Sequence, residues 1–167
     1  MLCYNNFILE LTHLCWFLVY LYYLPLMPTN NFKLLKKKSQ WLRKEIFEMV
    51  IKVNQGHIAS ALSQSEILVS LFYGKILKYK KKNPNFESRD RLIISKGHSA
   101  MGLYPILSDI GYFSKKELLK YGTPKGKLRI YGDMSIPGID STSGSLAQAP
   151  GIACVFALSA KRDKKGF

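Results

Sequence analysis

The chain has 167 residues, of which 47% are hydrophobic, enough for about one domain with a buried core. Its formal net charge is +14, from 25 basic and 11 acidic side chains. The basic residues are scattered apart from three short lysine-rich runs, so we interpret them as a solvated surface and expect no nucleic-acid partner. Three cysteines without metal or redox spacing argue against a disulfide scaffold and favour the reducing cytoplasm.

The N-terminal segment differs from the rest of the chain. Leu11–Pro28 contains no Lys, Arg, Asp or Glu and has about the length that spans a bilayer. Lys36–Lys38 follow it, so the positive-inside rule would leave the remaining chain in the cytoplasm. Any contact with a membrane is therefore expected through residues 11–28 alone.

A second interpretation of this segment is a start of translation at Met27. We favour it, because nothing further along the sequence needs a membrane. In both interpretations the chain has two parts, an apolar extension over residues 1–28 and a domain over residues 29–167.

The domain begins with a helical pattern. Leu42, Ile46 and Met49 recur at helical spacing, which predicts an amphipathic helix from about Phe32 to Gly56. Glycine commonly ends a helix, and His57 is then expected in the loop that follows it.

A second helix and a strand are predicted next. Ser63–Glu66 has the pattern of a capping box and opens an apolar helix. Arg91–Ser95 predicts a short buried strand, because continuous apolar runs are typical of parallel sheets covered on both faces. The turn Lys96–His98 lies at the carboxyl end of this strand, where ligands of open α/β sheets bind.

The remaining elements alternate helices with loops. A helix is expected from Ala100 to a stop at Gly111, and a second capping box at Ser114–Glu117. Residues 122–143 predict a long ordered loop, and Pro150 fits the first turn of a final helix. The alternation of helices with a strand predicts an α/β fold.

Two short turns carry the functional signal of the sequence. Lys96–His98 is one of them, and the small-residue turn Gly144–Gln148 is the other. Backbone N–H groups at the start of a helix bind anions, and a histidine carries a proton or a charge near neutral pH. Together the two turns indicate a site for a phosphate-bearing cofactor.

The order and intervals of these motifs resemble the N-terminal part of transketolase. The resemblance extends from about Leu35 to Lys165, and Asp90–His98 is its sharpest match. The matching segments are Gly56–His57, Ser63–Phe72, Arg89–His98, Gly111–Phe113, Pro137–Asp140 and Gly144–Leu146.

The resemblance implies a fold, a cofactor and a reaction. It implies an α/β thiamine diphosphate-binding domain with a parallel sheet and helices on both faces, incomplete in this chain. It implies transfer of a two-carbon ketol unit between sugar phosphates, with thiamine diphosphate and Mg²⁺ as cofactors.

The resemblance also implies roles for five residues. His57 matches a catalytic histidine that contacts the oxygens of the sugar, and His98 matches one beside the cofactor diphosphate and the donor substrate. Gly144, Ser145 and Leu146 match the loop that approaches the cofactor.

The sequence departs from the family pattern at several positions. Ile58 and Ala59 replace the proline and glycine that usually follow the first histidine. Ala147 and Ala149 replace glycines of the cofactor loop, where a methyl group would crowd the diphosphate. Tyr131 stands roughly where a third histidine is expected, which leaves the substrate contact there open.

The family's metal-binding motif, Gly-Asp-Gly followed later by Asn, comes after the helix that ends near Ala160. We therefore expect this chain to lack the metal ligands of the family. We interpret it as a truncated product and expect it to be inactive by itself. The implied partner is the C-terminal half or subunit of transketolase, within a homo- or hetero-oligomer in an intact relative. The alternatives are a subunit of another thiamine diphosphate-dependent sugar-pathway enzyme and a membrane-anchored protein without catalysis.

Overall fold

A computed structural model describes residues 29–164 of the chain. The apolar segment over residues 11–28, with both interpretations of it, lies outside these residues. No helix within residues 29–164 is long and apolar enough to cross a membrane. The chain divides into two compact units, residues 1–34 and 35–167, and the second contains all of the predicted site residues.

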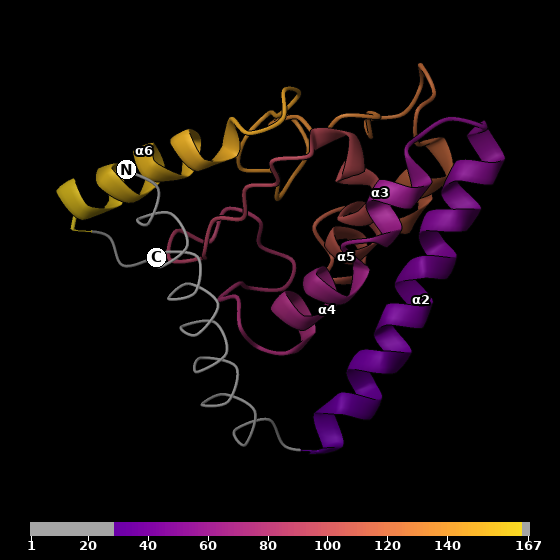
Figure 1. Ribbon diagram of the computed structural model, residues 1–167, viewed down its shortest axis with the longest axis horizontal. Helices are drawn as coiled ribbons and strands as arrows, with labels where there is room; N and C mark the ends of the chain where they lie inside the picture. Colours follow the sequence, from indigo (N-terminus) through magenta and orange to yellow (C-terminus); the bar gives the residue numbers. More distant parts are fainter. Residues whose placement is uncertain (1–28, 165–167) are drawn as a thin grey trace, which may run out of the picture. The chain divides into compact units, whose positions relative to one another are not determined.

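The described residues form helices joined by long irregular segments (Figure 1). Helices were predicted from about Phe32 to Gly56, after Ser63–Glu66, from Ala100 to Gly111 and around Pro150, and a helix is present in each of these places. A 3₁₀ helix makes up the first part of the predicted helix that begins at Ala100. The elements in chain order are α2 (Thr29–Val53), α3 (Ile58–Leu62), α4 (Ser65–Tyr73), the 3₁₀ helix η2 (Gly97–Gly102), α5 (Tyr104–Asp109), the 3₁₀ helix η3 (Lys115–Lys120) and α6 (Ala149–Arg162).

Helix α2 forms as its apolar spacing predicts. Leu42, Ile46 and Met49 share one face and are buried in the core. The helix ends at Val53, earlier than predicted, because Asn54 already takes the left-handed conformation with φ of 51°. Asparagine tolerates this region better than most residues, so it ends the helix ahead of the predicted glycine.

The predicted strand over Arg91–Ser95 does not form, and residues 29–164 contain no strand at all. A strand needs a neighbouring strand to pair its backbone groups, and here side chains take that place. The Leu92 N–H donates to the Asp140 carboxylate at 3.0 Å, and the Ile94 carbonyl accepts from Ser143 Oγ at 2.9 Å. The expected parallel sheet with helices on both faces is therefore absent from the described part of the chain.

The two predicted capping boxes have different outcomes. The first is wrong, because Ser63 ends α3 and donates its hydroxyl to the Ser60 carbonyl. Ser114 does cap η3, since its Oγ accepts from the Lys116 N–H at 3.3 Å. Glu117 does not complete that box and instead accepts a bond from Lys120.

The predicted stop at Gly111 is confirmed. Its φ of 85° lies in the left-handed region that favours glycine. The Gly111 N–H donates to the Ser108 carbonyl and the Tyr112 N–H donates to the Leu107 carbonyl, which is the pair of bonds of a Schellman motif.

A partly exposed carboxylate on α5 forms hydrogen bonds to side chains of α2 and α4. Asp109 accepts from Lys38 Nζ at 2.7 Å and from the Tyr73 hydroxyl at 2.6 Å. Partial burial would raise the pKa of Asp109, but these two hydrogen bonds and the lysine charge outweigh it and hold the pKa below its usual value.

The short helices pack in sequence around the buried core. Helix α3 contacts η2, η2 contacts α5, and α5 contacts η3. The first of these contacts places the turn before α3 beside the turn that begins η2.

Candidate functional site

The structure brings the two predicted catalytic histidines together. His57 directly precedes α3, and His98 is the second residue of η2. The centroids of the two rings lie 5.1 Å apart, with the ring planes at 61°, which is an edge-to-face arrangement. His57 is exposed and His98 is half-buried, so both imidazoles are open to solvent.

The predicted cofactor loop lies beside the turn that contains His98. The Ala147 N–H donates to Ser95 Oγ at 3.1 Å. A Cβ atom built on Gly97 would lie 2.2 Å from the Ser143 carbonyl oxygen, so only glycine allows this approach. The two turns that carry the functional signal of the sequence are therefore neighbours in space.

The loop presents free backbone donors. Gly144, Ser145 and Leu146 are exposed, and their N–H groups donate to no other part of residues 29–164. A Cβ atom on Gly144 would meet nothing within 4 Å, so space is open beside the loop. Imidazoles and backbone N–H groups next to open space fit an anionic diphosphate.

Ala147 occupies a conformation that favours glycine. Its φ is 68°, which places its methyl group in the strained left-handed region. Ala149, the second substituted glycine position, is instead a buried residue in the first turn of α6. The two departures from the family pattern thus differ in their structural consequences.

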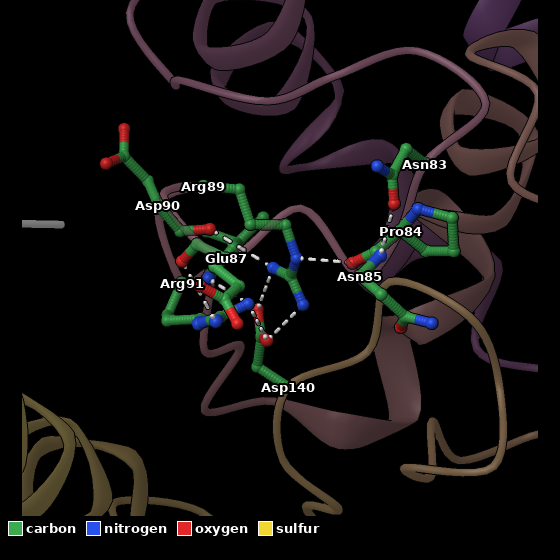
Figure 2. A network of polar contacts seen from close by, with 9 residues as sticks. Asn83, Pro84, Asn85, Glu87, Arg89, Asp90, Arg91 and Asp140 are labelled. Carbon is green, nitrogen blue, oxygen red and sulfur yellow. Dashed lines mark hydrogen bonds and ion pairs between the residues drawn. The ribbon is translucent and has the colours of Figure 1, made fainter.

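A buried ion pair, shown in Figure 2, anchors the segments that lead into both turns. Arg89 Nη1 and Nη2 donate to the two carboxylate oxygens of Asp140, at 2.8 and 2.5 Å. Arg89 Nε also donates to the Pro84 carbonyl, and Arg91 Nη1 lies 3.7 Å from Asp140. We call the Arg89–Asp140 pair the clasp. Since 51 positions separate its two residues, no local spacing pattern indicates that they pair.

A lysine joins the turn of His98 to helix α3. Lys96 Nζ donates to the Ser60 carbonyl at 3.0 Å and to Ser63 Oγ at 2.8 Å. The sequence pattern placed Lys96 in the functional turn but did not predict that its side chain hydrogen-bonds to Ser60 and Ser63. Lys96 is thus engaged with the protein at the edge of the site.

Tyr131, in the place expected for a third histidine, is exposed. A Cβ atom on its neighbour Gly132 would lie 3.1 Å from the Ala100 Cβ, so this segment lies against η2. The phenol therefore lies on a segment that packs close to His98 in the fold.

One groove in the described residues lies away from the histidines. A groove of about 430 Å³ between α2 and η3 is lined by Met49, Leu118 and Leu119, with charged side chains at its rim. Within residues 29–164 there is no cluster of three or more His, Cys, Asp and Glu side chains arranged to hold a metal ion.

Comparison with known proteins relates most of the chain to a single family. Residues 36–166 match the family model described as transketolase, thiamine diphosphate binding domain. The 6-deoxy-6-sulfo-D-fructose transketolase subunit of Clostridium sp. (strain MSTE9) is 35% identical over 130 residues, which are 77% of this chain and 47% of that protein. An apulose-4-phosphate transketolase subunit of Phocaeicola vulgatus is 30% identical over 133 residues, 80% of this chain and 47% of that protein.

A solved structure shows the same fold. The crystal structure of transketolase from Campylobacter jejuni superimposes with a TM-score of 0.74 at 33% identity, covering 79% of this chain and 21% of that one. The chain spans about half the length of the two bacterial relatives and about a fifth of that transketolase.

Proposed function

Because the chain belongs to the transketolase family through its thiamine diphosphate-binding domain, we propose that it takes part in ketol transfer between sugar phosphates. The observation that carries the proposal is the meeting of His57, His98 and the 144–146 loop at one surface. Two imidazoles beside unpaired backbone donors suit a phosphorylated cofactor and a hydroxyl-rich substrate.

In this proposal His98 and the loop hold the diphosphate. The N–H groups of Gly144, Ser145 and Leu146 would hold it, and Gly97 lets the loop lie close to the turn of His98. His57, the more exposed of the two histidines, donates to sugar oxygens and moves protons at its ring nitrogens. When bound, thiamine diphosphate supplies the electron sink for breaking the carbon–carbon bond.

The proposal includes Mg²⁺ and a second polypeptide region. A diphosphate beside backbone N–H groups still needs a hard cation with oxygen ligands. Residues 29–164 contain no cluster of three or more His, Cys, Asp and Glu side chains arranged to hold a metal ion. Two of the relatives are named as subunits, which supports a partner that carries the rest of the enzyme. We expect the partner to be a C-terminal transketolase half, and we expect no ketol transfer by this chain alone.

The proposal is tested in a chimera. The segment of Campylobacter jejuni transketolase that superimposes on this chain is replaced by residues 36–166, and ketol transfer is measured with thiamine diphosphate and Mg²⁺. We expect a measurable rate, and a loss of kcat/KM of about 100-fold or more in His57→Ala or His98→Ala. Gln40→Ala, an exposed change on α2, serves as the control and leaves the rate unchanged.

A folded chimera that binds the cofactor and is indifferent to both histidine substitutions would contradict the proposal. A folded chimera that does not bind thiamine diphosphate would contradict the assignment of the cofactor loop.

A different sugar substrate is the second candidate, and Tyr131 favours it. A phenol hydrogen-bonds sugar hydroxyls with a shape and reach unlike those of an imidazole. In the chimera, Tyr131→His is expected to change the ratio of kcat/KM between two acceptor sugars. An unchanged ratio removes this candidate.

A further inference from the structure

The arrangement of the two histidines depends on other residues. Neither imidazole forms a hydrogen bond within residues 29–164, and the ring contact is the interaction between them. His57 and His98 also belong to different elements, so their geometry follows from how α3 is held against η2.

A buried amide joins these two elements. Gln64 lies between α3 and α4 and is 6% exposed, and Ser99, the neighbour of His98, is fully buried. Gln64 Nε2 donates to the Ser99 carbonyl at 2.7 Å. The Ser99 hydroxyl lies 2.7 Å from the Lys96 carbonyl and 3.2 Å from Gln64 Oε1, and these two acceptors share its single proton. Both ends of the amide therefore contact the single residue that follows His98.

The surrounding fold leaves room for this amide. A Cβ atom on Gly102 would lie 2.7 Å from Gln64 Nε2, so a larger residue at that position would displace it. Lys96, bonded to Ser60 and Ser63, supports the other side of the same turn. The turn of His98 is thus fixed on both sides, at residue 96 to α3 and its C-cap, and at residue 99 to the segment between α3 and α4.

We propose that Gln64 is a positioning residue that sets the distance and angle between the His57 and His98 rings. An amide costs more to bury than an apolar side chain of equal volume, and its value lies in directed bonds. Sliding of η2 along α3 would break both bonds to Ser99, so they fix one register of the two elements. The role in ligand binding rests on the proposed function, whereas the geometric role stands by itself.

The geometric role is tested by nuclear magnetic resonance on the full chain. Gln64→Met keeps a long side chain but removes the donor and the acceptor. We expect the nuclear Overhauser effect between the two imidazole rings to be lost while the thermal transition remains cooperative. Gln40→Met, the same change at an exposed position of α2, leaves this effect intact. An unchanged ring-to-ring effect in Gln64→Met overturns the proposal.

Ser99→Ala decides the question if Gln64→Met does not fold. It removes the hydroxyl that Gln64 Oε1 and the Lys96 carbonyl share, and it keeps the bond from Gln64 to the Ser99 carbonyl. The ring-to-ring effect must then weaken, and an unchanged effect overturns the proposal.

The role in binding is tested with inorganic pyrophosphate, followed on the ring signals of His98. We expect the dissociation constant to rise about tenfold in Gln64→Met and to stay unchanged in Gln40→Met. If the unmodified chain does not bind pyrophosphate, the proposed function loses its diphosphate site, while the ring-to-ring measurement still decides the role of Gln64.

Discussion

Two buried tyrosines in the core differ in how their hydroxyl groups are satisfied. The ring centroids of Tyr104 and Tyr121 lie 6.1 Å apart, and both side chains are almost fully buried. The Tyr104 hydroxyl donates to the Arg129 carbonyl at 2.8 Å, whereas the Tyr121 hydroxyl has no partner in the described structure. Burial raises the pKa of Tyr121 to about 12, so it stays a neutral, unpaired phenol near neutral pH.

Removal of the two hydroxyls is therefore expected to have opposite effects. Tyr121→Phe should leave the free energy of unfolding unchanged or raise it by up to ~1 kcal/mol, because an unpaired buried hydroxyl is lost. Tyr104→Phe should lower it by about 1 kcal/mol, because the Arg129 carbonyl loses its donor. Urea denaturation of both variants checks this, and a clear loss of stability in Tyr121→Phe would contradict it.

Backbone strain at Ala147 gives a second prediction for a single residue. Since its φ is 68°, Ala147→Gly is expected to raise the free energy of unfolding by about 0.5–1 kcal/mol. Ala153→Gly, at an exposed position inside α6, is the matched control and should lower the free energy of unfolding by about 1 kcal/mol. Thermal unfolding separates the two, and a loss in Ala147→Gly would show that the loop does not strain this residue.

At the level of elements, the clasp joins two segments that contain no regular structure. The side chains of Arg89 and Asp140 are 10% and 5% exposed, and their bidentate geometry replaces the strand pairing that this region lacks. Removal of one partner leaves the other charge buried without a counter-charge. The resulting loss in free energy of unfolding is larger than the net stabilisation that the intact pair provides.

Asp140→Asn is expected to lower the free energy of unfolding by about 3–5 kcal/mol. Asp163→Asn, which removes a pair with Arg162 that is 79% and 40% exposed, should change it by less than about 1 kcal/mol. Urea denaturation followed by circular dichroism compares them, and similar small effects would show that the clasp does not hold the two segments.

Local signals in the sequence predicted several helix ends, although the capping box at Ser63 was wrong and α2 ends before Gly56. The stop at Gly111, the cap at Ser114 and the position of Pro150 depend on conformations within a few residues, and all three agree with the structure. The strand over Arg91–Ser95 was wrong, because a strand depends on a partner that its own residues do not specify.

The two predicted turns and the two histidines could be selected from their residue types, and the fold brings them together. The hydrogen bonds of Gln64, Lys96 and the clasp could not be predicted from residue types, because the bonded residues lie 33 to 51 positions apart in the sequence. The sequence showed no charge pattern or spacing that distinguishes Gln64 from a surface glutamine.

For the whole molecule, α6 is the element with the largest mismatch between composition and environment. Its sequence is apolar over most of its length, yet Ala149 and Ala160 are its buried residues, and Val155 and Leu158 are 65% and 67% exposed. A helix that is apolar on all sides is normally covered by other protein. We therefore expect the isolated chain to self-associate through α6.

Charge on this helix should reduce the self-association. Val155→Lys with Leu158→Lys is expected to shift the chain toward monomer in analytical ultracentrifugation. A variant with lysines at the exposed polar positions Gln40 and Gln55 adds the same charge and should leave the distribution unchanged. An equal shift in both variants would show that net charge, and not the apolar face of α6, controls association.

The sequence distance between the two residues of each clasp and loop contact influences the order of folding. The bonds from Arg89 to Asp140 and from Ala147 to Ser95 close loops of 51 and 52 positions, whereas the Schellman bonds at Gly111 are local. Closing a long loop costs more chain entropy than forming a helical turn, so the core helices should form before the loop reaches the histidines. During synthesis, this surface is then completed only after residue 147 has left the ribosome.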